Sequence, residues 1–223
     1  MSANDLGPGP RTRVRRLPAK ASYDADTIYA ILDEARFCHV TAIVDGRAVA
    51  LPTLHSREGH TLFIHGSQSN AVLRSVIASG EACVTVTLYD GLRLARSGFE
   101  SSIAYRSVVV FGVAVEVSDR HEKTRVLNQF VDAILPGRAG EVRPMSDQEQ
   151  RLTLVVAVTV DEASAKVSAG PTEDPDEDKE LPIWSGSVPA RMVFDQPVPS
   201  VDGAMASGVV EVPASVRALL ERR

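Results

Sequence analysis

The sequence predicts a mainly β protein, an antiparallel barrel with flanking helices. At least six runs have the composition of strands, and Asp-Gly pairs follow two of them. Three helical patterns occur at separate points of the chain. They do not alternate with the strands as crossover helices do in a parallel sheet, and there is no G-x-G-x-x-G motif. These observations favour an antiparallel barrel over a dinucleotide-binding fold.

The chain has 223 residues, of which 44% are hydrophobic, enough to form the core of one domain with tails. We expect an N-terminal arm over residues 1–16, the barrel domain over 17–195, and a C-terminal tail with a short helix over 196–223. The 24 basic and 29 acidic residues give a net charge of -5, which argues against a dedicated nucleic-acid binder.

Targeting and metal signals are absent from the sequence. No run approaches the ~20 apolar residues of a membrane span, and the N-terminus has no apolar signal region. Cys38 and Cys83 lie far apart in apolar runs, which predicts buried free thiols and no metal site. We therefore expect a cytoplasmic protein that does not bind a membrane.

The N-terminal arm divides into two parts. Met1–Pro10 is rich in glycine and proline, so we expect it to be disordered. A short basic segment follows, with Arg11, Arg13, Arg15 and Arg16. We expect it to be solvated or to dock on a partner subunit, with nucleic-acid binding a less favoured alternative.

A helix and a hairpin come next. Asp24–Phe37 has apolar residues at helical spacing, with Asp24 or Asp26 near its start. Cys38–Val44 and Arg47–Leu54 are then predicted strands. Asp45-Gly46 joins them, and such a pair predicts a two-residue turn in which both residues have positive φ.

The stretch Thr61–Gly80 contains the most chemistry. It begins as a strand, breaks at His65-Gly66-Ser67 and restarts as a helix, with Ser69 as the expected N-cap and Gly80 as the stop. Small polar residues at a helix start provide free N–H groups and a partial positive charge that suit a phosphate. The alternative interpretation is an ordinary connection between a strand and a helix.

Further strands follow this helix. Ala82–Leu88 is a predicted strand, and Asp90-Gly91 turns the chain into a second one, Leu92–Ser97. The valine-rich run Tyr105–Val117 is a predicted central strand. Gly112 within it indicates a bulge or a close backbone approach.

The last third of the chain mixes helices, short strands and an acidic loop. We expect a helix over Asp119–Leu135, a strand over Leu152–Val160, a solvated and mobile loop over Thr172–Glu180, a short strand over Ser187–Phe194, and a small helix over Pro213–Arg222.

Candidate site residues lie in three segments. His55 and His65 each lie where a strand ends beside the Thr61–Gly80 stretch. Arg106 and Ser107 lie near the start of the central strand, where a guanidinium and a hydroxyl suit ribityl or phosphate oxygens. The alternative for Arg106 is an ion pair with a surface carboxylate.

The third segment contains Trp184, the only tryptophan, with Arg191 seven residues further on. This indole could stack on a planar ligand. It could equally fill a gap in the core, and from the residues alone we favour the core.

The combined order of motifs resembles a known family. A hairpin, then TLFIHGSQSNAVLR, then YRSVVVFG, then a Trp…Arg pair is similar to the pyridoxamine 5'-phosphate oxidase-related family, from about Arg13 to Arg191. Within it the chain looks most like the flavin-nucleotide-binding branch that includes the nitroimidazole-resistance proteins. The resemblance implies a split β-barrel homodimer that binds FMN at two sites between its subunits.

The resemblance also implies a set of FMN-binding positions. These are Leu51, Pro52, Thr53 and Leu54 for the flavin ring, then Ile64, His65, Gly66, Ser69 and Asn70, then Ser107, and finally Trp184 and Arg191 across the dimer interface. Asn70-Ala71 stands where true oxidases have Arg-Lys, so the phosphate would rely on Ser67, Ser69, the helix N-terminus, and Arg74 or Arg106.

The function expected from this resemblance is an FMN-dependent oxidoreductase that acts on a small organic molecule. His65 is the candidate for proton transfer. No histidine follows His121, so the oxidase's substrate motif is absent and we do not expect vitamin B6 oxidation. The alternative is a flavin or haem binding or storage protein without turnover, and the sequence does not distinguish FMN from F420.

Overall fold

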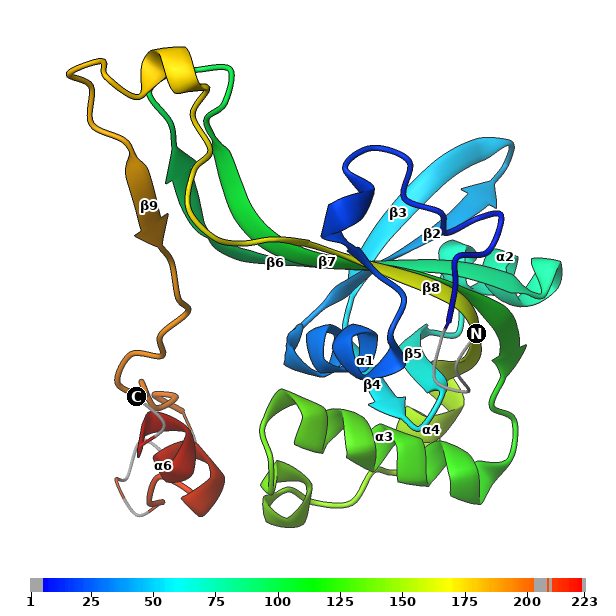
Figure 1. The fold of residues 1–223 in the computed structure, drawn as a ribbon. Helices are drawn as coiled ribbons and strands as arrows, with labels where there is room; N and C mark the ends of the chain where they lie inside the picture. Colours follow the sequence, from blue (N-terminus) through cyan, green and yellow to red (C-terminus); the bar gives the residue numbers. More distant parts are fainter. Residues whose placement is uncertain (1–5, 203–207, 209, 222–223) are drawn as a thin grey trace.

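The computed structural model describes residues 6–202, 208 and 210–221. Its strands form one nine-stranded antiparallel sheet in the order β3-β2-β6-β7-β8-β5-β4, with β1 paired to β8 and β9 to β6 (Figure 1). The strands are β1 (Ala21–Ser22), β2 (Cys38–Val44), β3 (Arg47–Thr53), β4 (His55–Glu58), β5 (Thr61–Ser67), β6 (Glu81–Leu94), β7 (Ser102–Glu116), β8 (Thr153–Ser168) and β9 (Gly186–Pro189). The predicted mainly β fold with flanking helices is confirmed.

The α-helices in the described part of the chain are α1 (Ala25–Glu34), α2 (Ala71–Ser79), α3 (Arg120–Ile134), α4 (Asp147–Leu152) and α6 (Ala214–Glu221). Four of them, α1 to α4, begin at a residue whose side chain caps them. Asp24 caps α1 by accepting a hydrogen bond from the Thr27 N–H, and Asp119 caps α3 through the Glu122 N–H. An uncapped helix start leaves N–H groups without partners, so these side chains decide where each helix begins.

Two apolar clusters lie on opposite faces of the sheet. The larger one fills the barrel with side chains from all the long strands, α1 and α2, among them Ile28, Val40, Ile64, Leu73, Val110 and Val156. The second joins Phe63 and Val155 to Val126, Leu127 and Phe130 of α3. Successive residues of a strand face opposite ways, so β5 buries Ile64 in the barrel and Phe63 under α3.

The first Asp-Gly pair forms the predicted turn. Asp45 and Gly46 both have positive φ, 51° and 74°, between β2 and β3. The second pair does not, and this prediction is wrong. β6 continues through Asp90 and Gly91 with a bulge between Tyr89 and Gly91.

Gly91 lies where β9 packs closely against β6. Its φ is 139°, and a Cβ atom there would lie 2.3 Å from the Val188 carbonyl oxygen of β9. Because glycine has no side chain, β9 can lie close to the bulge. Gly91 is therefore required by a contact between distant strands and not by a local turn. Gly112 fulfils its prediction, because the register shifts beside it and a Cβ atom would lie 2.2 Å from the Thr159 carbonyl oxygen.

Several element bounds differ from the predictions. β8 has 16 residues and is longer than expected because it continues beyond Val160 to pair with the outer half of β7. β9 ends at Pro189, before the expected Phe194, since proline cannot continue the ladder. In the C-terminal tail, α6 ends at Glu221, and Arg222 lies outside the described residues.

The described part of the N-terminal arm lies against the sheet. The Leu6 N–H donates to the Tyr23 carbonyl oxygen, and Arg11 forms ion pairs with Asp161 and Glu162. The ordered segment from residue 6 to residue 12 differs from the disordered arm that we expected, whereas Arg13, Arg15 and Arg16 are exposed, in agreement with a solvated basic segment. Met1–Asp5 lie outside the described residues, and the domain boundaries stay a prediction.

One end of the sheet extends away from the helices. The outer halves of β6 and β7, the segment after β8, and β9 form an arm beyond the body (Figure 1). Large apolar side chains on this arm are exposed, among them Tyr89, Leu92, Phe99, Ile103, Trp184 and Val188, and Met192 and Val193 just after β9 are exposed too. Within the described ranges, no helix has the length and apolar character needed to cross a membrane.

Candidate functional site

The corner between β5 and α2 is organised by three polar side chains. β5 runs through His65 to Ser67 without the break that we predicted. The N-cap of α2 is Asn70, whose Oδ1 accepts from the Leu73 N–H at 3.1 Å, and the prediction of Ser69 is wrong. Ser69 instead shares a 3.0 Å hydrogen bond with the Ser67 hydroxyl. Two exposed hydroxyls therefore lie next to the N-terminus of a nine-residue helix.

The end of β3 lies beside the end of β5. β4 pairs with β5 only as far as Ile64, so one edge of His65–Ser67 is open. The Thr53 hydroxyl donates to the His65 carbonyl oxygen across this edge at 3.5 Å. The structure thus brings together the predicted segments Leu51–Leu54 and Ile64–Gly66. Ile64 is fully buried in the barrel, so only its backbone could serve a ligand.

Gly66 allows the strand to pass under the helix. A Cβ atom at Gly66 would lie 2.9 Å from Leu73 Cδ1 and 3.3 Å from Asn70 Nδ2. A side chain there would have to displace the ends of the Leu73 and Asn70 side chains. Glycine at this position therefore leaves room for both side chains beside the strand end.

Arg74 is the cation at this corner. Its Nε donates to the Gln68 carbonyl oxygen at 2.9 Å, and it forms a 3.3 Å ion pair with Glu116 of β7. The side chain is about half exposed, so the pair is well screened by water. Sequence reasoning missed Gln68, which fixes Arg74, because nothing in its local pattern distinguishes it from a surface residue.

Arg106 lies at the other end of β7 and not at the corner. Glu116 beside Arg74 is ten residues further along β7, about 33 Å of extended strand. Arg106 binds Asp90 at 2.8 and 2.9 Å and also Glu34, and both carboxylates raise its pKa. Its assignment to the phosphate corner of the same chain is therefore wrong, and its partners are carboxylates.

Ser107, Trp184 and Arg191 also lie on the side of the arm. Ser107 is in register with Thr87 of β6 and Lys166 of β8. Trp184 is 66% exposed just before β9, so the interpretation that it fills the core of this chain is wrong. Arg191 is exposed just after β9. The predicted site residues therefore form two groups, one at the corner and one on the arm.

His65 faces α3 and not the barrel. Its ring centroid lies 4.3 Å from that of Phe130, and its Nδ1 is buried without a hydrogen-bond partner among the described residues. Burial lowers the pKa of His65 because an apolar setting disfavours the charged imidazolium. The ring is neutral at pH 7, a state that can accept a proton.

We expect the pKa of His65 to lie below 6.5, its ordinary value, in an NMR titration of the folded protein. Phe130→Leu exposes the His65 ring more to water and should move the titration midpoint of His65 back toward 6.5. The unfolded state takes up the proton first as the pH falls, so the unfolding free energy should decrease from pH 6.5 downward. His65→Gln should make this decrease smaller, and an unchanged pH dependence would contradict the assignment.

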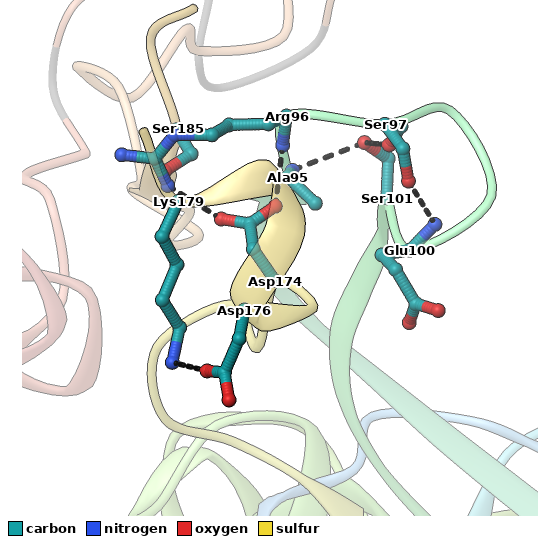
Figure 2. A network of polar contacts seen from close by, with 9 residues as sticks. All are labelled: Ala95, Arg96, Ser97, Glu100, Ser101, Asp174, Asp176, Lys179 and Ser185. Carbon is teal, nitrogen blue, oxygen red and sulfur yellow. Dashed lines mark hydrogen bonds and ion pairs between the residues drawn. The ribbon is translucent and has the colours of Figure 1, made fainter. Parts of the chain in front are cut away.

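The acidic loop is held by one buried carboxylate. Figure 2 shows Asp174 accepting from the backbone N–H and the guanidinium of Arg96, both at 2.7 Å. The same guanidinium donates to Ser185 at 2.8 Å, and Lys179 pairs with Asp176. The Asp174 side chain is only 4% exposed. We expected the loop to be solvated, and for Asp174 this is wrong.

Asp174→Ala is expected to release this loop. Arg96 would keep a buried Nε with no partner and lose its only described carboxylate, which disfavours the folded arrangement. Limited proteolysis should then cut residues 171–185 faster than in the parent protein. Asp176→Ala, which removes an exposed ion pair on the same loop, is the control and should change the cleavage rate little.

Comparison with known proteins identifies the family of this chain. A family model described as pyridoxamine 5'-phosphate oxidase matches residues 24–167, more than half of the chain. The chain belongs to this family. Its resemblance to the pyridoxamine 5'-phosphate oxidase family is therefore confirmed, together with the fold. A search of curated proteins finds no match.

Two solved structures are similar over nearly their whole length. The flavocytochrome Anf3 from Azotobacter vinelandii is 34% identical, with 95% of this chain and 97% of that chain covered and a TM-score of 0.88. The FAD and haem binding protein from Mycobacterium smegmatis is 35% identical, with 90% and 97% covered and a TM-score of 0.84. A candidate 5-nitroimidazole resistance protein from Bacteroides thetaiotaomicron, 22% identical with 66% and 86% covered and a TM-score of 0.56, shares the fold.

Proposed function

We propose that this chain is a flavin-binding redox protein and that the flavin phosphate binds at the corner of β5 and α2. The arrangement of Ser67, Ser69 and the α2 N-terminus carries the proposal. Its hydroxyls are exposed, and the first N–H groups of a helix have no partner within the helix. Membership of the family and the two relatives above 30% identity support a flavin over other phosphate ligands.

The corner suits the phosphate that FMN and FAD share. The resemblance seen in the sequence favours FMN, whereas the M. smegmatis relative is described as binding FAD. The Leu51–Leu54 segment lies next to the corner across the Thr53–His65 contact and would hold the flavin ring through its backbone groups. Chromatography of the released cofactor distinguishes the two flavins.

We assign the second half of the site to another copy of the chain. Arg106, Ser107, Trp184 and Arg191 lie at the far end of the sheet from the corner, and the arm that holds most of them exposes large apolar side chains. Such exposed apolar surface is typical of a surface that another subunit covers. A homodimer in which each arm reaches the partner's corner would complete two flavin sites.

A bound flavin would supply the electron transfer to or from a small organic molecule. The protein's part is then to bind the phosphate at Ser67 and Ser69, to orient the ring beside Thr53, and to exclude water. His65 is neutral and close to this segment, so it is our candidate to hold or accept a proton at its ring nitrogen.

Haem is a second candidate ligand, because both relatives above 30% identity are described as a flavocytochrome or as haem binding. Histidine is a common axial ligand of haem iron, which it binds through an imidazole nitrogen. His39 on β2 is one candidate, since its ring is partly exposed and its centroid lies 5.8 Å from that of Phe37. His39→Ala should abolish a Soret band without removing the flavin bands.

The absorbance spectrum of the purified protein tests both candidates. We expect flavin bands at about one flavin per chain, with a Soret band if haem is also bound. A colourless protein that takes up neither added FMN nor added FAD would overturn the proposal. Photoreduction followed by reoxidation with candidate acceptors separates an oxidoreductase from a storage protein, because storage predicts no acceptor-dependent turnover.

A further inference from the structure

Two cationic side chains meet at one buried hydroxyl at the end of β8. Ser168 is the last residue of β8 and is only 1% exposed. Its Oγ accepts hydrogen bonds from Lys20 Nζ and from Arg93 Nη1, both at 3.2 Å. Lys20 ends the short helical turn Pro18–Lys20 just before β1, and Arg93 lies in the outer half of β6. Three segments that are distant in sequence therefore bring two positive charges to one point.

Arg93 is a buried cation without a carboxylate. The residue is only 9% exposed, and it forms no ion pair with any described residue. Besides Ser168, its guanidinium donates to the Pro171 carbonyl oxygen, and its buried Nε has no hydrogen-bond partner in the described part of the chain. Arg96, three residues later, is instead paired with the buried Asp174 carboxylate. An unpaired buried charge is strongly unfavourable, so we expect an anionic partner for Arg93.

Hydrogen-bond donors exceed acceptors in this cluster. A serine hydroxyl has two acceptor lone pairs and one donor, and Lys20 and Arg93 use both lone pairs of Ser168 Oγ. The hydroxyl proton and the two other N–H groups of Lys20 Nζ have no acceptor among the described residues. A ligand that satisfies the cluster must therefore accept hydrogen bonds and carry negative charge.

The two cations lie close enough together for one anion to bind both. Lys20 Nζ and Arg93 Nη1 are each 3.2 Å from the same oxygen atom, so at most twice that distance separates them. A phosphate accepts charge-assisted hydrogen bonds of about 2.8 Å through oxygens on different sides, which spans such a gap. Lys20 is partly exposed, so an ion can reach it from the solvent.

We propose that Lys20, Arg93 and Ser168 bind a phosphate group. A phosphate ester carries a charge of about -1.5 to -2 at pH 7 and so matches two cations, whereas a carboxylate neutralises only one. Ser168 is in register with Tyr105, at the end of β7 away from the flavin corner. None of the three residues belongs to that corner, so this second phosphate site does not rest on the proposed redox function.

Phosphate-dependent thermal stability tests the site in the full-length protein, dialysed into phosphate-free buffer. Inorganic phosphate at millimolar concentrations should raise the Tm saturably, with sodium chloride keeping the ionic strength constant, because a ligand that binds only the folded state stabilises it. Propionate should bind at least about tenfold more weakly. Equal effects of phosphate and propionate, or no effect of phosphate beyond that of chloride, would overturn the proposal.

Matched variants locate the bound phosphate. Lys20→Met removes one of the two charges at similar side-chain length and should weaken phosphate binding about tenfold. Lys123→Met, the same change at a partly exposed lysine of α3, should leave the affinity unchanged. Ser69→Glu, which places a negative charge at the flavin corner, should leave it unchanged too. Loss of binding in Ser69→Glu but not in Lys20→Met would assign the phosphate to the corner. Equal losses in the two lysine variants would show a general charge effect, and either result would overturn the proposal.

Arg93 gives an independent readout. The NMR signal of its Nε–H should shift as phosphate saturates the parent protein, and at the same phosphate concentration it should shift less in Lys20→Met. Arg93→Met removes the unpaired buried charge, so its Tm in phosphate-free buffer should fall little or rise, and phosphate should no longer raise it. An Arg93→Met variant that responds to phosphate like the parent would contradict the assignment. The NMR shift is measured on the parent protein, so it remains decisive if Arg93→Met does not fold.

Discussion

A mixture of two defective variants is expected to bind flavin although neither variant binds it alone. Ser69→Glu places a negative charge at the corner, where it repels a phosphate while agreeing with the helix dipole. Trp184→Ala with Arg191→Ala removes the exposed pair on the arm. If each site takes its corner from one copy and its arm from the other, a mixed dimer contains one intact site.

The flavin content expected of the mixture can be calculated. Random exchange of equal amounts makes half of the dimers mixed, and each has one working site of two, so about one quarter of the parent flavin content should return. Flavin absorbance per chain after co-refolding measures this. Ala78→Glu, the same charge on an exposed position further along α2, is the control and should keep full binding. No recovery in the mixture would place both halves of the site in one copy. Flavin binding by the arm variant alone would place the arm outside the site.

Adding a cation to the corner is expected to tighten flavin binding. Ala71 is the exposed first residue of α2, at a position where oxidases of the resembling family have the second residue of an Arg-Lys pair. Ala71→Lys leaves the Asn70 cap in place and adds a charge beside the proposed phosphate. A charge-assisted hydrogen bond of about 1.5 kcal/mol corresponds to roughly tenfold tighter binding.

Fluorescence titration of the apoprotein with FMN and FAD measures this effect. The gain should shrink as salt increases, because added ions screen an exposed charge. Ala78→Lys is the matched control near the other end of α2 and should change the affinity little. Equal tightening by both lysines would indicate a general charge effect and would contradict a phosphate at the corner.

Local signals predicted much of the fold. Asp24 and Asp119 cap their helices, and Asp45-Gly46 adopts the positive φ values of its turn, because each of these depends on a few neighbouring atoms. The corner was also recognisable, since a strand end, small polar residues and a helical pattern follow one another directly. The N-cap was misplaced by one residue because Ser69 and Asn70 are both good caps.

Long-range contacts explain the errors. Gly91 has the same local sequence signal as Gly46, but β9, almost a hundred residues later, approaches it and the strand continues as a bulge. Arg106 met the chemical requirements of a phosphate ligand, yet Glu34 of α1 and Asp90 of β6 bind it. The loop residue Asp174 resembles its acidic neighbours in sequence, and only the position of Arg96 distinguishes it.

The corner and the arm show which features local sequence predicts and which depend on contacts between distant parts of the chain. Local sequence predicted the class of fold, the starts of α1 and α3, and the type of residues at the corner, because these follow from periodicity and from interactions a few residues apart. The packing of distant elements determines that Trp184 is exposed and that Arg106 is bound by carboxylates. These features depend on which strands and helices, distant in sequence, pack together. No pattern of neighbouring residues in the chain specifies that packing.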